Sequence, residues 1–126
     1  MKRFLFVTVV TLVFALFVYS VFAAPSEVGV VIMHGKWGSP QSMSSLAREL
    51  ESKGYLVSNA EMAWSGRRLY DVDYPTALKE IEQEVQQLRA KGVKRVVGAG
   101  QSMGSNAGVA YASPRFDLEG LMVLLP

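Results

Sequence analysis

Four short apolar runs are spaced along the chain and alternate with segments of helical periodicity. The runs are rich in Val, Leu, Ile and Met and lie at 28–33, 55–57, 95–99 and 121–125. Short apolar runs with this composition are typical of strands that are buried on both faces of a sheet. The pattern therefore predicts four buried strands.

Between these runs, apolar residues recur every three or four positions, which indicates one-sided amphipathic helices. Capping and breaking residues then set the limits of each helix. We expect a helix over 43–50 with Ser42 as N-cap and Gly54 as its stop, one from the first-turn residue Pro75 to near Gly92, and a small-residue helix over 103–112 that stops before Pro114.

The predicted order is β-α-β-α-β-α-β. Strands and helices that alternate in this way form right-handed crossovers, so the expected fold class is α/β, with a parallel sheet and helices on both faces. Ligands bind such sheets beyond the carboxyl ends of the strands. The glycine-containing loops that follow Met33 and Ala99 both fall at that edge, which makes it the expected site.

The first 23 residues have the pattern of a secretory signal peptide. A basic start, Met1–Arg3, precedes the apolar run Phe4–Val18, and Val21-Phe22-Ala23 fits the small-residue pattern before a cleavage point. Residues 4–22 are also just long enough for a membrane anchor, the alternative interpretation. We expect an exported protein, periplasmic or secreted, whose folded domain occupies residues 24–126.

Charge and cysteine content exclude several classes of partner. Lys2 and Arg3 are two of the 13 basic residues, and without them basic and acidic residues balance at 11 each. Nucleic acids and anionic membrane surfaces require a clustered excess of Lys and Arg, so neither is an expected partner. The sequence has no cysteine, which excludes a disulfide scaffold and a Cys-based metal site.

The motif Gly100-Gln101-Ser102-Met103-Gly104 stands between the third predicted strand and the third helix. Gly-x-Ser-x-Gly requires this strand-turn-helix setting, in which a sharp turn lifts the serine oxygen off the sheet edge. Glycines at both ends leave space where a Cβ atom would collide with neighbouring backbone. The motif predicts that Ser102 is a nucleophile, with a glycine-rich turn bearing a surface serine as the plainer interpretation.

A dinucleotide-binding loop is a competing interpretation of the same glycines. Gly98-Ala99-Gly100 could begin a Gly-x-Gly-x-x-Gly fingerprint, but its third glycine position is Met103. Methionine at that position prevents the close approach of helix and strand, so nucleotide binding is disfavoured.

The loop that begins at His34-Gly35 follows the first strand. Its backbone N–H groups can point toward the serine and supply half of an oxyanion hole, with the N–H of Met103 as the other half. Lys36 is the expected donor and Trp37 the second choice. His34 is expected to brace this loop by hydrogen bonding rather than to act as the general base.

Trp64, Arg67 and Arg68 lie on the loop after the second strand, also at the carboxyl edge. They are candidates to shape a substrate pocket or to meet an acidic substrate group, although such residues are more often solvated, with the tryptophan partly packed. The glutamates at 80, 82 and 84 are expected to form a solvated helix face.

Together these residues resemble the α/β-hydrolase superfamily, in particular its small esterases and dienelactone-hydrolase-like members. The resemblance rests on 30–35 and 96–104, and it extends from Val28 to Pro126. It implies Ser102 as nucleophile, an oxyanion hole from the backbones of Lys36 and Met103, and acyl transfer from a small ester without metal or organic cofactor. Family members usually have histidine where this sequence has Gln101.

The resemblance also implies a triad in the order serine, acid, histidine. After Ser102 only Asp117 and Glu119 are acidic, both before the last predicted strand, and there is no histidine. We therefore expect the N-terminal half of a longer hydrolase, inactive as it stands because a serine without a base is a poor nucleophile. The alternative is a non-catalytic binding or remnant protein on the same scaffold.

Overall fold

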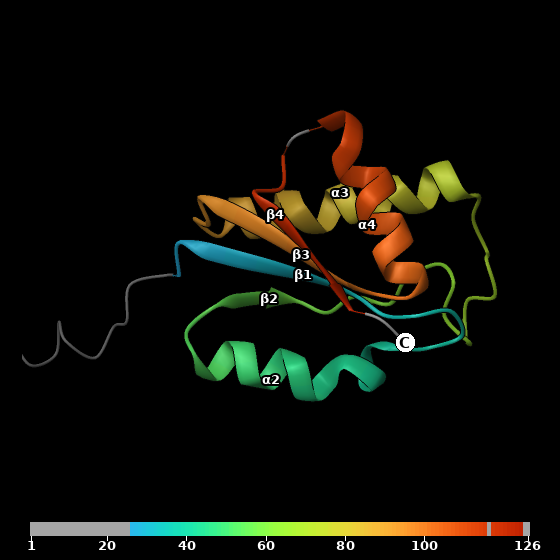
Figure 1. The fold of residues 1–126 in the computed structure, drawn as a ribbon, viewed down its shortest axis with the longest axis horizontal. Coiled ribbons are helices and arrows are strands. Elements are labelled where there is room, and N and C mark those ends of the chain that lie inside the picture. The colour runs from blue at the N-terminus through green and yellow to red at the C-terminus, as the bar shows by residue number, and fades with distance from the viewer. Residues whose placement is uncertain (1–25, 116, 125–126) are drawn as a thin grey trace, which may run out of the picture.

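The computed structural model describes residues 26–115 and 117–124. Its centre is a four-stranded parallel sheet in the order β2-β1-β3-β4 (Figure 1). The strands are β1 (Val28–Met33), β2 (Leu56–Ser58), β3 (Arg95–Gln101) and β4 (Gly120–Leu124). The predicted α/β class with a parallel sheet is confirmed.

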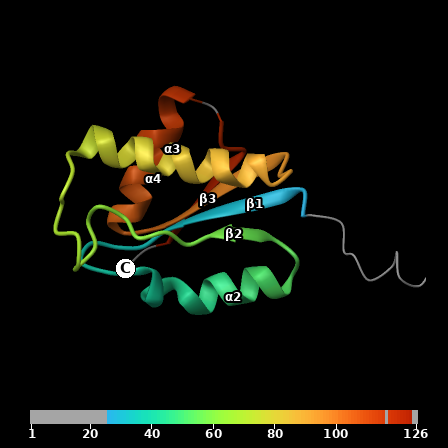
Figure 2. The same ribbon diagram turned by 180° about the vertical axis from the view of Figure 1, so that it is seen from behind.

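Helices cover both faces of this sheet, as predicted. Helices α3 and α4 lie on one face, and α2 lies on the other, which the two opposed views show (Figures 1 and 2). The helical elements are η1 (Pro40–Met43), α2 (Ser44–Ser52), α3 (Tyr74–Ala90) and α4 (Met103–Arg115).

Each face of the sheet has its own apolar core, because side chains of a strand alternate between the two faces. Along β1, Val31 and Met33 pack toward α3 and α4, where Ile81 and Tyr111 are buried with them. Val30 and Ile32 pack on the opposite face with a cluster that includes Met43 and Ala47. The continuous apolar run of β1 is thus explained by burial on both faces.

Two helix limits differ from prediction. The first helical segment begins at Pro40 with a 3-10 turn, and Ser42 lies inside that turn, where its hydroxyl donates to the Ser39 carbonyl at 2.6 Å. Ser42 is therefore not the N-cap of the helix. Helix α4 runs on through Pro114 to Arg115, although a proline at this position removes one hydrogen bond to the preceding turn.

The expected stops at Gly54 and Gly92 are confirmed. Each glycine directly follows the cap of a helix and has a positive φ, 91° and 94°, a left-handed conformation that glycine adopts without a steric penalty. The third strand is longer than predicted, because it continues through Gly100 and Gln101 to the serine.

The predicted signal peptide, residues 1–23, lies outside the described residues. Within 26–115 and 117–124, none of the helices combines the length and the apolar character that a bilayer crossing requires.

Candidate active site

Ser102 occupies the sharp turn between β3 and α4. Its φ is +50°, a left-handed conformation that is unfavourable for a residue with a side chain, and Ser102 is exposed. The Ser102 N–H donates to the Leu124 carbonyl at 3.2 Å, and its own carbonyl accepts from the N–H groups of Ser105 and Asn106. These bonds hold the turn while the hydroxyl faces solvent.

The two glycines of the motif are required by close backbone contacts. A Cβ atom on Gly104 would lie 2.0 Å from the Met33 carbonyl oxygen, and one on Gly100 would lie 2.5 Å from the Gly104 carbonyl oxygen. Helix α4 can therefore start directly over the ends of β1 and β3 only because both positions lack a side chain. The predicted reason for these glycines is confirmed.

The loop after β1 passes beside the serine. A Cβ atom placed on Gly35 would be 3.6 Å from the Cβ atom of Ser102. Within the described residues, the N–H groups of Lys36 and Met103 donate to no acceptor. Met103 is the first residue of α4, where N–H groups lack partners inside the helix and favour negative charge.

Trp37, the second choice as donor, is not free to serve as one. Its N–H donates to the Trp64 carbonyl at 2.9 Å, which ties the loop after β1 to the loop after β2. The φ of Trp37 is +60°, and its side chain is 53% exposed. Lys36 remains as the candidate donor of this loop.

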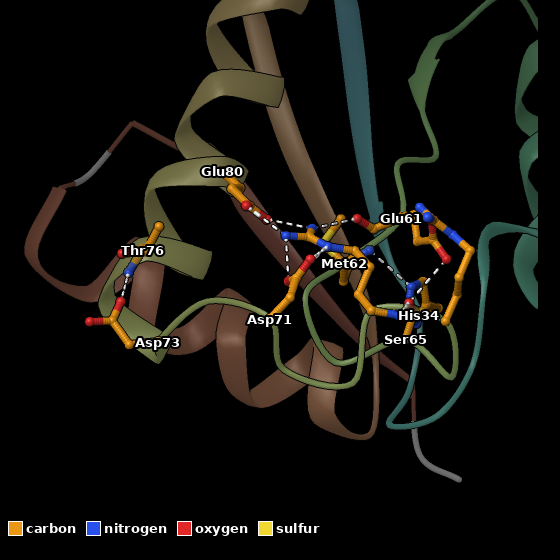
Figure 3. Close-up of polar contacts among 10 residues, drawn as sticks. His34, Glu61, Met62, Ser65, Asp71, Asp73, Thr76 and Glu80 are labelled. Atoms are coloured by element: carbon orange, nitrogen blue, oxygen red, sulfur yellow. Dashed lines mark hydrogen bonds and ion pairs between the residues drawn. The ribbon is translucent and has the colours of Figure 1, made fainter.

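His34 is fully buried, and both of its ring nitrogens are engaged. Nε2 accepts a hydrogen bond from the Met62 N–H at 3.0 Å (Figure 3). Nδ1 therefore carries the proton and donates to the Gly35 carbonyl at 2.9 Å. The ring fixes the start of the loop after β1. In this state it has no lone pair available to take a proton from Ser102.

Trp64 does not line the substrate pocket that the sequence suggests. It is only 1% exposed, because its indole lies in the core and donates to the His34 carbonyl at 2.7 Å. Arg67 is paired with Glu61, and the hydrogen bonds from Arg67 lower the pKa of that carboxyl. The burial of Trp64 thus corrects the prediction for that residue, and a role for Arg67 in binding stays a prediction.

Arg68 is the centre of a polar network that was not predicted. Its guanidinium contacts Glu80 and Asp71 and donates to the Glu61 carbonyl at 3.1 Å (Figure 3). These bonds, with that to Glu80 first, raise the pKa of Arg68, and its contact with Asp71 lowers the pKa of that carboxyl. The charge of Arg68 is thus balanced by Asp71 of the same loop and by Glu80 of α3.

The glutamates of α3 are less solvated than expected. Glu80 binds Arg68, and Glu84 accepts a hydrogen bond from the Ser58 hydroxyl at 2.6 Å. These bonds fasten α3 to the end of β2 and to the loop that follows it. Sequence reasoning missed them because their partners are distant along the chain.

Leu69 and Tyr70 are a further surprise at this edge of the sheet. Both have positive φ, 52° and 59°, and both are exposed. The Tyr70 ring meets the Trp37 ring edge-on, with 5.6 Å between centroids. The sequence does not indicate these conformations, because left-handed backbone is normally found at Gly, Asn or Asp.

The two acids that follow Ser102 in the sequence lie at the opposite edge of the sheet. Glu119 accepts from the Val96 N–H near the start of β3, and Asp117 binds the Tyr111 hydroxyl. Val96 and Ser102 are separated by the length of β3, about 20 Å at the rise of a strand. Neither acid can serve as the partner of a base beside Ser102.

Comparison with solved structures finds a similar fold in two hydrolases. A metagenome-derived lipolytic enzyme aligns with a TM-score of 0.70 at 26% identity, over 80% of this chain and 42% of its own. An extracellular alpha/beta-hydrolase from a Paenibacillus species aligns with a TM-score of 0.60 at 19% identity, over 76% of this chain and 39% of its own. This chain thus spans about two fifths of either structure. No protein-family model and no curated relative matches the sequence.

Proposed function

We propose that this chain, which carries part of the α/β-hydrolase fold, provides the nucleophile of a serine hydrolase that cleaves carboxylic esters or related acyl bonds. The observation that carries the proposal is the exposed Ser102 at φ +50° between β3 and α4, with Gly35 beside it. A serine held in this conformation at the carboxyl edge of a parallel sheet is suited to attack a bound carbonyl carbon.

In the proposed reaction, the Ser102 Oγ adds to the ester carbonyl and the negative charge moves to the carbonyl oxygen. The N–H groups of Lys36 and Met103 donate hydrogen bonds to this oxyanion. The positive end of the α4 dipole stabilises it further. The C–O bond to the alcohol then breaks and the alcohol leaves with a proton. Water hydrolyses the acyl-serine and restores the hydroxyl.

The serine proton requires an acceptor, and the residues described here do not supply one. His34 is the one histidine of the sequence, and both its nitrogens are engaged. We propose that the base comes from outside these residues and that the chain by itself is inactive. Loss of the triad base lowers kcat by a factor on the order of 10⁶ in a serine protease.

The two similar structures support the proposed substrate class and location. One is lipolytic, which fits a small ester as substrate, and the other is extracellular, which fits the export predicted from residues 1–23. Export with a cleaved signal peptide and a folded domain over 24–126 is part of the proposal. Retention of residues 4–22 as a membrane anchor is its alternative.

Labelling with a fluorophosphonate tests the nucleophile. The probe phosphonylates an activated serine, and intact mass measures the adduct on the 126-residue chain and on the Ser102→Ala and Ser113→Ala variants. We expect slow labelling that accelerates with added imidazole, because imidazole can act as an external base. The adduct should disappear in Ser102→Ala and persist in Ser113→Ala, which removes an exposed serine of α4.

Two results would contradict parts of this proposal. Fast, stoichiometric labelling without imidazole would show that the chain has its own base, and the claim of inactivity would be wrong. A folded chain with no Ser102-dependent adduct, even with imidazole at alkaline pH, would favour the alternative of a non-catalytic binding protein.

A further inference from the structure

Three large apolar side chains are exposed together at the carboxyl edge of the sheet. Trp37 is 53%, Leu69 63% and Tyr70 41% exposed, and we call these three residues the apolar rim. The edge-on contact of the Trp37 and Tyr70 rings joins the loop after β1 to the loop after β2. Clustered exposed apolar side chains commonly mark a binding site.

The backbone of the rim is strained in the same way as that of the nucleophile. In the described part of the chain, the non-glycine residues with positive φ are Trp37, Leu69, Tyr70 and Ser102. Such conformations persist only where surrounding bonds enforce them, and they cluster at functional sites. The coincidence of strain at Ser102 and in the rim indicates that both belong to one site.

Hydrogen bonds on the far side of the loop hold the rim in place. The N–H groups of Leu69 and Tyr70 donate to the carbonyls of Ser65 and Ala63. Arg68, which directly precedes Leu69, donates its own N–H to the Ser65 hydroxyl at 3.0 Å. The loop is therefore preorganised, so ligand binding would lose little conformational entropy in ordering it.

The rim is close enough to Ser102 to contact a substrate whose carbonyl carbon meets the serine. Gly35 lies beside Ser102, and Trp37 follows Gly35 by two residues, a span of at most about 7 Å. Where the loop after β2 enters α3, the Tyr74 hydroxyl donates to the Asn106 side chain at 2.7 Å, one turn of α4 after the serine. Both loops that carry the rim thus come near the nucleophile.

We infer that the apolar rim binds the hydrocarbon part of the substrate, so that the preferred esters carry a neutral alkyl or aryl group. This inference rests on the proposed function, because it takes Ser102 as the point where the carbonyl is held. The Lys36 ammonium lies 5.0 Å from the centre of the Trp37 ring and disfavours a cationic substrate group. Trp37 and Tyr70 are then residues that determine specificity.

The two tryptophans provide a direct test, because Trp64 is buried and Trp37 is exposed. Acrylamide quenching of tryptophan fluorescence therefore reports on Trp37. We expect hexyl acetate and methyl hexanoate to protect it at concentrations at least about tenfold lower than methyl acetate, since burial of several methylene groups favours binding. Comparison of the two longer esters shows whether the alcohol or the acyl side meets the rim.

Variants locate the binding surface. Tyr70→Ala and Leu69→Ser should each weaken protection by the longer esters several-fold and leave methyl acetate unchanged. Met122→Ala is the matched control, because Met122 lines a separate apolar groove of about 310 Å³ between α2 and the sheet. If neither rim variant changes protection, the inference is wrong. It is also wrong if the esters have no effect and the rim variants instead abolish self-association of the chain.

The same assay separates this inference from the proposed function. Ser102→Ala should bind the longer esters as the unchanged chain does, because the rim is intact. Ester binding without a Ser102-dependent fluorophosphonate adduct would leave the rim as a binding site and overturn the nucleophile. An adduct without rim-dependent binding would overturn only the inference on specificity.

Discussion

Gly104 is the residue at which α4 comes closest to the end of β1. A methyl group there would overlap the Met33 carbonyl oxygen, so Gly104→Ala must push the helix away from the sheet. We expect a loss of about 3 kcal/mol or more in the free energy of unfolding, measured by urea denaturation. Gly120→Ala is the control, because its nearest neighbour is a Val97 methyl at 3.9 Å; equal losses in the two variants would contradict the explanation.

Tyr111 makes the stability of the fold depend on pH in the alkaline range. Burial, and then its hydrogen bond to Asp117, raise the pKa of Tyr111. The pKa is about 10 in the unfolded chain, so this contribution is complete below pH 10 and is lost as the pH rises through the higher folded value. We expect Tyr111→Phe to be less stable at neutral pH and to lose stability less steeply above pH 10.

The measurement for Tyr111 is the midpoint of urea unfolding from pH 7 to pH 11. Tyr55→Phe serves as the comparison, because Tyr55 is exposed. If Tyr111→Phe and the unchanged chain lose stability in parallel above pH 10, the buried hydroxyl is not the cause.

Single residues differ in how far the sequence could predict them. Gly100, Ser102 and Gly104 were predictable because a fixed spacing dictates the turn that they form. Trp64 was not, because a tryptophan in an irregular segment gives no periodic sign of burial. The conformation of Tyr70 was hidden for the same reason, since only contacts from distant segments enforce it.

Helix α3 begins at a cap that the sequence analysis passed over. The Asp73 carboxylate accepts from the Thr76 N–H at 2.9 Å, and the hydrogen bonds from Thr76 lower the pKa of Asp73. The cap is therefore complete above pH 4 and is lost as the pH falls through the lowered value. We expect Asp73→Ala to lower Tm at pH 7 by a few degrees and Asp73→Asn to lower it less.

The comparison of Asp73→Ala with the unchanged chain should be repeated at pH 3. There the difference in Tm should shrink, because a protonated carboxyl is a weaker cap. A difference that stays constant with pH would mean that the carboxylate does not cap α3.

Whole elements were predicted more reliably than their ends. Apolar periodicity placed all four strands and three helices, because burial on one or both faces dictates that pattern. The predicted helix limits were wrong at Ser42, whose hydroxyl bonds inside a 3-10 turn, and at Pro114, through which the helix continues. The bonds of Glu80 and Glu84 on α3 to Arg68 and Ser58 were also missed. The sequence does not show that these segments are neighbours in the fold.

At the scale of the whole molecule, β4 forms one side of the sheet. In the described residues no strand pairs with its outer edge, and Met122 and Val123 are 54% and 52% exposed. Exposed edges with apolar side chains pair with other chains. We expect the chain to associate with increasing concentration in sedimentation experiments.

The variant Val123→Lys should reduce this association, because a charge on an edge strand opposes pairing. Val109→Lys, which changes an equally exposed residue on α4, should leave it unchanged. If both variants associate as the unchanged chain does, the edge of β4 is not the contact.

The fold class of the whole molecule could be predicted from the alternation of strands and helices. The order of the strands within the sheet could not. That order depends on which strands meet after each crossover, and all four strands have similar composition. The location of the candidate site could still be predicted, because ligands bind sheets of this class beyond the carboxyl ends of the strands. In this chain the loops that follow β1 and β3 both lie at that edge.

The strand made first, β1, lies between β2 and β3 in the sheet. Val30 pairs with Val57 on one side and with Val97 on the other, so the centre of the sheet joins segments that are far apart in the chain. Contacts of such long separation form slowly, and they cannot form before β3 has been synthesised. A ribosome would thus complete most of this sequence before the sheet could close, and the export proposed above would act on a chain that is still unfolded.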